Sequence, residues 1–198
     1  MLDDLKDVLY EGETVLWQGK PDKFCYMWRS VGKLLPVAII WLAFDGFFIS
    51  TVFATGAEMP QGMIWFMVGF FALHLLPVWK AVGTFVKKSL EHKNVVYAIT
   101  DKRVIDRNGV VGLDFDNITY TDIANVRVDV SVLERMRKVG SVFIATSSGA
   151  ALCLLSVEEP YEVYKRINKV FMDVKTDIHY PNALRPEVNP GYRTKYEG

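Results

Sequence analysis

Residues 31–53 read VGKLLPVAIIWLAFDGFFISTVF, and residues 63–85 read MIWFMVGFFALHLLPVWKAVGTF. These two apolar runs decide the fold, because each has about 20 residues and a helix of that length spans the roughly 30 Å hydrocarbon core of a bilayer. Residues 54–62, ATGAEMPQG, join the runs with turn-forming residues and a single charge, Glu58. The pattern predicts a two-helix transmembrane hairpin over residues 31–85.

Basic residues gather at the outer ends of the two apolar runs. They are Lys20, Lys23, Arg29 and Lys33 at the first run, and Lys80, Lys87, Lys88 and Lys93 at the second. Loops on the cytoplasmic side of a membrane carry an excess of lysine and arginine. We therefore expect a multi-pass membrane protein whose N- and C-termini are both cytoplasmic.

The composition leaves room for one small soluble domain beside the hairpin. The 198 residues include 23 basic and 23 acidic side chains, so the formal net charge is zero. Without an overall basic field, we expect no nucleic-acid partner. The chain opens with the acidic Leu2-Asp3-Asp4, which does not fit a cleavable signal peptide. Cys25 and Cys153 have no His or Cys neighbour at metal-ligand spacing, so we expect neither a metal nor a cofactor.

After residue 94 the sequence alternates between apolar and polar residues, as in β-strands. The pair Asn108-Gly109 is typical of a hairpin turn, because both residues tolerate positive φ. The expected strands cover residues 95–100, 103–107, 112–120, 124–130, 141–146 and 151–157. Six short strands in succession predict a small antiparallel β-barrel or sandwich.

A C-terminal helix is expected to close this domain. Pro160 fits the first helical position, behind Glu158 and Glu159, where negative charge complements the helix dipole. Its apolar stripe consists of Val163, Ile167, Val170, Phe171 and Val174. We therefore divide the chain into a cytoplasmic lead (1–30), the hairpin (31–85), a soluble domain (86–174) and an extended, proline-containing tail (175–198).

Three stretches resemble the bacterial PH (pleckstrin-homology-like) domain family. Residues 96–105, VYAITDKRVI, are similar to the Y-x-I-T-x-x-R segment of that family, and residues 131–135 and 140–144, SVLER and GSVFI, to its S-x-L-E-R … G-x-V-x-I stretch. Residues 13–21, ETVLWQGKP, resemble the lead that precedes the membrane hairpin. The resemblance implies a membrane α-helical hairpin plus a small PH-like β-barrel or sandwich with a C-terminal helix. It also implies a location in the bacterial cytoplasmic (inner) membrane. Assembly factors for photosynthetic complexes in this family are similar to the chain in layout.

A PH-like fold needs seven strands, and only six follow the hairpin. Residues 14–19 form a seventh strand-like run, and the predicted topology places it on the same side of the membrane as the other six. The lead is therefore expected to add a strand to the domain, which makes the hairpin an insertion in one cytoplasmic unit.

Asp45 and His74 lie near the middle of their apolar runs, at a similar depth in an antiparallel hairpin. A charged Asp at mid-membrane costs about 3 kcal/mol on insertion scales, so we expect a partner or neutralisation. Three interpretations stay open. The two residues could form a neutral hydrogen-bonded pair that locks the hairpin, a contact to another membrane subunit, or a proton-linked pair.

Other basic residues could contact anionic lipid headgroups. They are Lys80, Lys87, Lys88, Lys102, Arg103 and Arg107. The alternative is that they set topology and cover solvated strand faces. Residues 135–138, RMRK, form a second basic cluster, which is expected on an exposed loop.

The tail mixes aromatic, arginine and proline residues, which suits an extended peptide lying on a partner protein. Its candidate anchors are Tyr180, Arg185, Tyr192 and Arg193, and a solvated tail is the alternative.

The chain has no glycine-rich phosphate loop, no histidine-rich metal spacing and no nucleophile elbow, so we do not expect an enzyme. The sequence favours a non-catalytic scaffold, accessory subunit or assembly factor that binds a larger membrane protein complex, with homo-oligomerisation left open. One alternative is binding or sensing of anionic lipid by the PH-like domain, and another is a proton-linked membrane function of Asp45 and His74.

Overall fold

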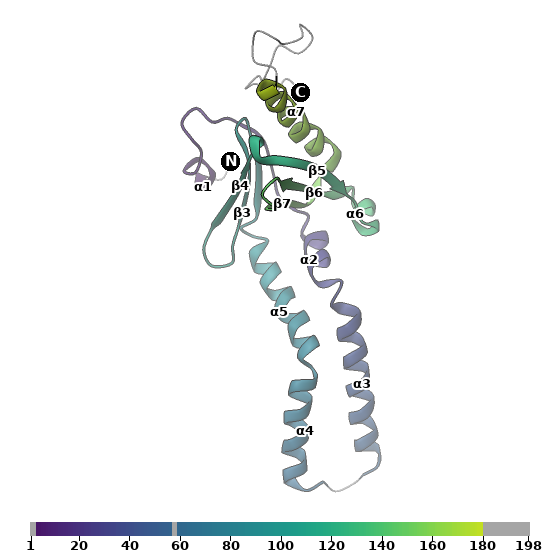
Figure 1. Cartoon of the computed structure of the whole chain (residues 1–198). Helices are drawn as coiled ribbons and strands as arrows, with labels where there is room; N and C mark the ends of the chain where they lie inside the picture. The colour runs from purple at the N-terminus through teal and green to yellow at the C-terminus, as the bar shows by residue number, and fades with distance from the viewer. Residues whose placement is uncertain (1–2, 57–58, 180–198) are drawn as a thin grey trace. The chain divides into compact units, whose positions relative to one another are not determined.

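A computed structural model of the chain describes residues 3–56 and 59–179, and these fall into two compact units (Figure 1). The hairpin unit is Tyr26–Leu90. The β unit combines Met1–Cys25 with Glu91–Gly198, so it contains chain from before and after the hairpin unit. The hairpin unit is thus an insertion in the sequence of the β unit.

Seven α-helices and one 3-10 helix are present among the described residues. They are α1 (Asp3–Lys6), α2 (Lys23–Val31), α3 (Leu35–Ala54), α4 (Gln61–His74), α5 (Leu76–Glu91), α6 (Val132–Met136), α7 (Pro160–His179) and η1 (Tyr120–Asp122). The strands are β1 (Val15–Gly19), β2 (Val96–Thr100), β3 (Arg103–Asn108), β4 (Asp114–Thr119), β5 (Ile123–Asp129), β6 (Val139–Thr146) and β7 (Ala151–Glu158).

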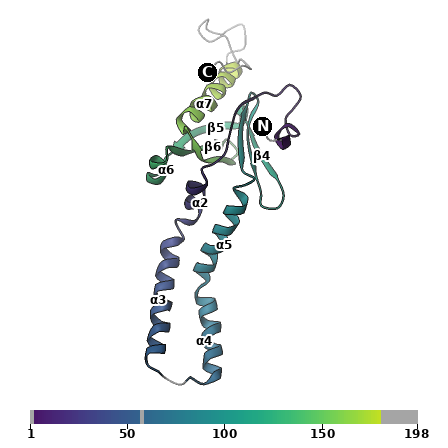
Figure 2. The same cartoon turned by 180° about the vertical axis from the view of Figure 1, so that it is seen from behind.

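In the hairpin unit, α3 runs beside α4 and α5 in both views (Figure 1 and Figure 2). Among the described residues, α3 is the one helix that is by itself long and apolar enough to cross a membrane. The second apolar run passes the same test only when α4 and α5 are taken together as one span, bent by 52°. The prediction of one continuous helix over residues 63–85 is therefore wrong, because the run breaks at Leu75.

The β unit contains two antiparallel sheets, with strand orders β1-β2-β3-β4 and β5-β6-β7. Strand β1 lies at the edge of the first sheet and pairs with β2, so that Val15 faces Thr100 and Gly19 faces Tyr97. The lead thus contributes the seventh strand, and its partner lies on the far side of the hairpin in sequence. The two packed sheets and α7 form a PH-like arrangement.

Helix α7 packs against β5, β6 and η1 and completes the core. Val163, Ile167, Val170 and Phe171 are buried, and they face sheet residues such as Ile144 that are also buried. Each such side chain contributes roughly 1.5–3 kcal/mol when fully removed from water. The helix continues to His179, so the prediction of an extended tail from residue 175 is wrong for its first residues. The remainder of that tail lies outside the described residues.

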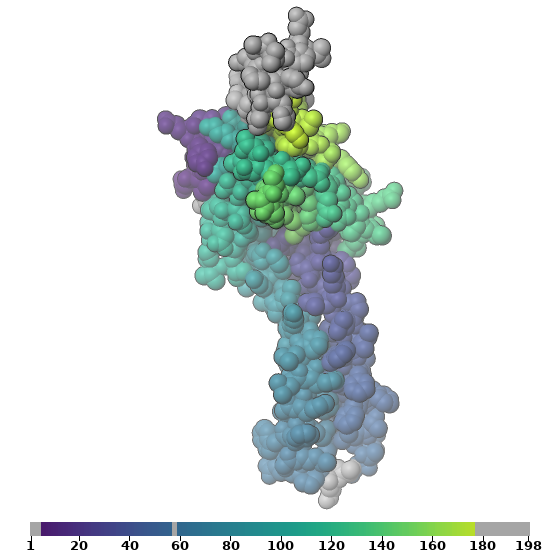
Figure 3. All heavy atoms as spheres, viewed as in Figure 1, coloured from purple at the N-terminus to yellow at the C-terminus, as the bar shows by residue number. Residues whose placement is uncertain are grey.

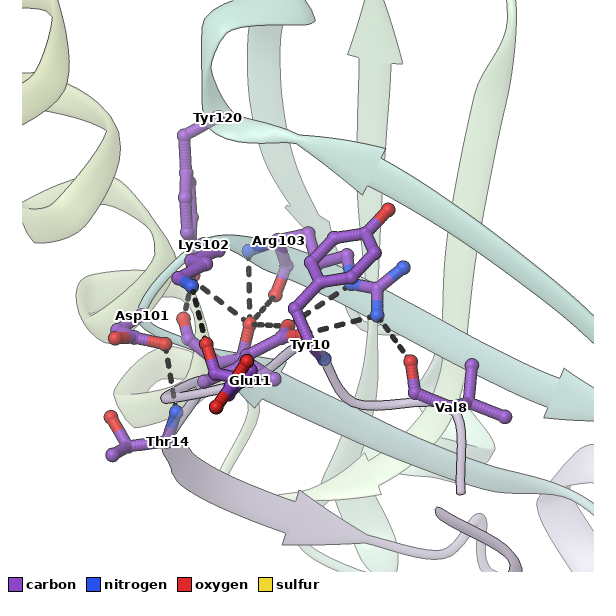
Figure 4. A network of polar contacts seen from close by, with 10 residues as sticks. Val8, Tyr10, Glu11, Thr14, Asp101, Lys102, Arg103 and Tyr120 are labelled. Atoms are coloured by element: carbon purple, nitrogen blue, oxygen red, sulfur yellow. Dashed lines mark hydrogen bonds and ion pairs between the residues drawn. The ribbon is translucent and has the colours of Figure 1, made fainter. Parts of the chain in front are cut away.

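A buried ion pair fastens the lead to the sheet (Figure 4). Arg103 donates from Nε to Glu13 Oε1 at 3.0 Å and from Nη2 to Glu13 Oε2 at 3.1 Å. The same guanidinium donates to the Val8 carbonyl at 2.7 Å and lies 3.9 Å from the centre of the Tyr10 ring. Thr100 Oγ1 donates to Glu13 Oε1 at 2.7 Å. Glu13 and Arg103 are 8% and 3% exposed, so the pair is shielded from solvent on both sides.

We expect Glu13→Gln to destabilise the β unit by about 3 kcal/mol, because it leaves the Arg103 guanidinium buried without its counter-charge. Amide hydrogen exchange of β2 and β3 in the full chain should then be faster by on the order of a hundredfold. The matched control is Glu11→Gln, since Glu11 is exposed. Equal protection of β2 in both variants would contradict the structural role of the pair.

The same variant should show a defined pH dependence. Burial raises the pKa of Glu13, but the hydrogen bonds from Arg103, Tyr10 and Thr100 outweigh it and hold the pKa below its ordinary value of 4.5. The ionised carboxylate therefore stabilises the fold above that value, and this stability is lost as the pH falls through the folded pKa. The difference in unfolding free energy between the wild type and Glu13→Gln should be full at neutral pH and shrink below about pH 4.5.

Candidate functional site

The hairpin unit contains a buried carboxylate paired with a histidine. Asp45, in the middle of α3, is 2% exposed, and His74 is the last residue of α4. His74 Nδ1 and Asp45 Oδ1 are 2.8 Å apart, a distance at which the ring N–H donates to the carboxylate. Within the described residues, Asp45 Oδ2 has no hydrogen-bond partner. The structure therefore brings the two residues together and leaves one buried carboxylate oxygen without a hydrogen bond among the described residues.

Aromatic rings surround His74. Trp41 and Phe70 stack on the imidazole with centroid distances of 5.8 Å and 5.2 Å, and Phe44 lies 6.0 Å away at a tilt. The His74 side chain remains 28% exposed at the hairpin surface.

The break between α4 and α5 fixes the position of His74. Pro77 has no N–H to donate to the carbonyl of Leu73, and its ring clashes with that carbonyl in a continuous helix. The carbonyl of Ala72 is freed at the same break, and it accepts instead from the Trp79 indole Nε1 at 3.2 Å. A proline and an indole therefore end α4 at the residue that contacts Asp45.

An apolar hollow of about 450 Å³ lies between the helices on the loop side of this pair. Its walls include Ile49 and Val52 of α3, Val68 and Phe71 of α4, and Leu75 and Trp79 at the break. The lining carries almost no polar surface. Such a hollow suits an apolar occupant, since burying a polar group there would leave it without a hydrogen bond.

Two arginines expected at lipid headgroups are internal instead, and this corrects the sequence-based expectation. Arg103 and Arg107 are both 3% exposed. Arg103 holds Glu13, and Arg107 donates to the Asn94 carbonyl at 3.0 Å. Sequence alternation could not reveal this, because a β3 position facing the core normally carries an apolar residue.

The other basic candidates remain at the surface. Lys80, Lys87 and Lys102 are exposed, and Lys102 also donates to the Glu11 carbonyl at 3.3 Å. Lys88 is half-buried, donates to the Tyr26 hydroxyl at 3.3 Å and lies over its ring. The tail candidates Tyr180, Arg185, Tyr192 and Arg193 lie outside the described residues.

Cys25 of the β unit lies in surroundings that suppress its reactivity. Burial and, after it, the neighbouring Asp22 raise the pKa of the Cys25 thiol to about 11, so the reactive thiolate is disfavoured. Between residues 3 and 179, leaving out 57 and 58, no group of three or more His, Cys, Asp or Glu residues is placed to hold a metal ion.

The sequence placed residues 135–138 on a loop, but residues 132–136 form the helix α6, and the loop prediction is wrong there. Ser131 caps this helix through a capping box with Glu134, whose side chain is 2% exposed. The S-x-x-E spacing of a capping box was readable at residues 131–134.

Comparison with family models gives the fold family of the chain. A family model described as "Bacterial PH domain" matches residues 37–170. A solved structure from Shewanella loihica PV-4, described as a DUF1696 family protein with a pleckstrin-homology domain, is 17% identical, with a TM-score of 0.33. That match covers 39% of this chain and 70% of the other. No curated protein matches the chain significantly.

We expect Pro77→Ala to straighten the break, because the restored N–H can donate to the Leu73 carbonyl. The 52° bend between α4 and α5 should then decrease. Nitroxide labels at Phe66→Cys and Val86→Cys, both exposed positions, would report a longer distance by pulsed electron paramagnetic resonance. Pro36→Ala is the matched control, since Pro36 lies in the first turn of α3, where proline is tolerated. An unchanged distance in Pro77→Ala would show that other residues cause the bend.

Proposed function

The chain belongs to the bacterial PH domain family, and we propose that it is a non-catalytic membrane scaffold that binds a larger membrane protein complex, as an accessory subunit or assembly factor. The observation that carries this proposal is the unpartnered oxygen of Asp45, buried in the hairpin unit close to an apolar hollow. A hairpin that served only as an anchor would be more stable with an apolar residue at that position, because Asp at the centre of a span costs about 3 kcal/mol.

Strand pairing supports a membrane hairpin with an even number of crossings. Strand β1 precedes the hairpin unit and β2 follows it, yet the two strands belong to one sheet. If α3 crosses a membrane, the chain must therefore return through α4 and α5, which then act as one bent span. The basic residues at the outer ends, such as Lys23 and Lys87, favour the cytoplasm for the β unit and for both termini. We assign the chain to the bacterial cytoplasmic membrane on this basis.

The partner is expected to be a transmembrane helix that offers a hydrogen-bond donor to Asp45 Oδ2. Because the chain itself shields this oxygen, the proposal requires the hairpin to open around Asp45 when the partner binds. Polar groups in lipid are satisfied by neighbouring helices, since no water is available there. The apolar hollow next to Asp45 would receive the side chains that flank this donor. An accessory subunit or assembly factor needs such a selective contact within the bilayer, and a simple tether does not.

Two alternative functions remain proposals. The 2.8 Å contact between Asp45 and His74 also suits a proton-linked pair. The exposed Lys102 suits binding of anionic lipid by the PH-like domain, with Lys80 and Lys87 of the hairpin unit as further headgroup contacts and now without Arg103 and Arg107. Asp45→Asn separates the first alternative from the scaffold, because it abolishes proton exchange by the carboxylate while keeping a polar contact for a partner.

The scaffold is tested by photo-crosslinking in living cells of the native host. A photoreactive residue at Ile49, on the wall of the hollow, should crosslink to one membrane protein partner that also co-purifies in mild detergent at a fixed stoichiometry. Ile40 is the control position, because it lies on the opposite face of α3 and is 63% exposed. A chain that purifies alone, or a crosslink only to a second copy, would contradict the proposal.

A substitution series then tests the role of Asp45. We expect Asp45→Leu to weaken partner retention by about tenfold or more, because a hydrogen bond to a charged group contributes roughly 1.5–3 kcal/mol. Thr51→Val is the matched control, since the Thr51 hydroxyl is exposed and bonds within its own helix to the Phe47 carbonyl. Equal retention of the partner by both variants would exclude Asp45 from the contact.

A further inference from the structure

The first sheet of the β unit ends in an edge strand, β4. The strand order of this sheet is β1-β2-β3-β4, and among the described residues no strand pairs with the outer side of β4. Strand β7 contacts both β3 and β4, so it crosses the face of the sheet and does not extend the sheet beyond β4. The β3–β4 hairpin lies at the margin of the β unit, both in the cartoon and in the space-filling view (Figure 1 and Figure 3). An edge strand directs the N–H and C=O groups of every second residue away from its sheet, where another extended segment can pair with them.

The side chains of β4 restrict which segment can pair with this edge. Asp114 and Asp116 are exposed, and they lie on one face of the strand because they are two residues apart. Phe115 lies on the opposite face and packs against the buried cluster that contains Ile105. The β4 edge is therefore acidic on one face and carries a half-buried aromatic ring on the other.

A second copy of β4 fits this edge poorly. Two β4 strands paired antiparallel in one continuous sheet would bring Asp114 and Asp116 of both copies onto the same face. Like charges across a strand pair destabilise it. The segment that fits the β4 edge must instead carry two basic residues at a spacing of two.

The C-terminal part of the chain contains such a segment. Residues 192–196, which lie outside the described residues, read YRTKY and include no acidic residue. In an extended conformation Arg193 and Lys195 share one face, and the two tyrosines and the threonine share the other. Tyrosine and threonine are also residues that favour strands.

One antiparallel register matches this segment to β4. It places Arg193 opposite Asp116, and Lys195 then lies opposite Asp114. Opposite charges directly across an antiparallel pair stabilise the pair. The two tyrosines lie on the face of Phe115, within reach of its ring along the diagonals. Both faces of the β4 edge are therefore complementary to the segment in a single register.

The chain is long enough for this pairing to form within one molecule. Helix α7 contacts η1, which directly follows β4. The C-terminal end of β4 therefore lies alongside α7, whose 20 residues span about 30 Å. The residues from 180 to 191 can extend to about 40 Å. They can reach the C-terminal end of β4 from the end of α7, and the segment that follows then runs antiparallel to β4.

We propose that residues 192–196 add a strand to the first sheet, antiparallel to β4, with Arg193 against Asp116 and Lys195 against Asp114. The tail then covers an edge that could otherwise pair with other chains. This inference depends neither on the membrane location nor on the scaffold proposal.

Amide hydrogen exchange in the full chain tests this pairing. Arg193→Asp should speed the exchange of the β4 amides that point away from β3 severalfold, because a like charge then faces Asp116. Arg185→Asp is the matched control, since it makes the same change in the tail outside the segment and should leave β4 unaffected. The charge swap Arg193→Asp with Asp116→Arg should restore the slow exchange, because it rebuilds the ion pair in the opposite sense.

Three results would overturn the inference. The first is equal exchange of β4 in Arg193→Asp and Arg185→Asp. The second is a charge swap that exchanges as fast as Arg193→Asp, since the register requires the two positions to face each other. The third is protection of β4 that disappears when the wild-type protein is diluted, which would assign the added strand to a second copy of the chain.

Discussion

The pairing of β1 with β2, closed by the Glu13–Arg103 ion pair, is the constraint on which the rest of the structure depends. It joins residues that precede the hairpin to residues that follow it, so the first sheet cannot be completed until the chain has passed through the whole hairpin. The same pairing requires both ends of the hairpin to lie on one side of any membrane it crosses. The folding of the β unit and the topology of the hairpin therefore depend on the same contact between β1 and β2. This contact is non-local in sequence, so forming it carries a high loop-closure cost.

Much of the fold could be predicted because apolar periodicity reports burial directly. The two apolar runs, the seven strands and the stripe of α7 through Val163 and Ile167 all follow from period and turn chemistry. The break at Leu75 was harder to predict, although Pro77 was visible, because membrane helices tolerate proline when neighbours satisfy the freed groups. Here the satisfying group is the Trp79 indole, which the spacing of residues does not reveal.

The candidate site was predictable only in part. Similar depth of Asp45 and His74 follows from an antiparallel hairpin, but their contact depends on α4 ending at His74. The unpartnered Oδ2 is a matter of side-chain geometry that sequence cannot give. The burial of Arg103 and Arg107 was missed for the same reason, since an arginine on a strand reads as a surface residue until its acidic or carbonyl partner is known.

The buried carboxylates of this chain differ in how fully their oxygens are hydrogen-bonded. Glu13 accepts from an arginine, and Glu134 accepts from a backbone N–H and three hydroxyls, so both are saturated by groups of the β unit. A carboxylate whose oxygens already accept several hydrogen bonds has little capacity to bind a ligand. Removing such a carboxylate lowers the stability of the fold. Asp45 differs, because one of its oxygens has no donor among the described residues. A donor from a partner helix would satisfy this oxygen, whereas the carboxylates of Glu13 and Glu134 already accept several hydrogen bonds within the β unit.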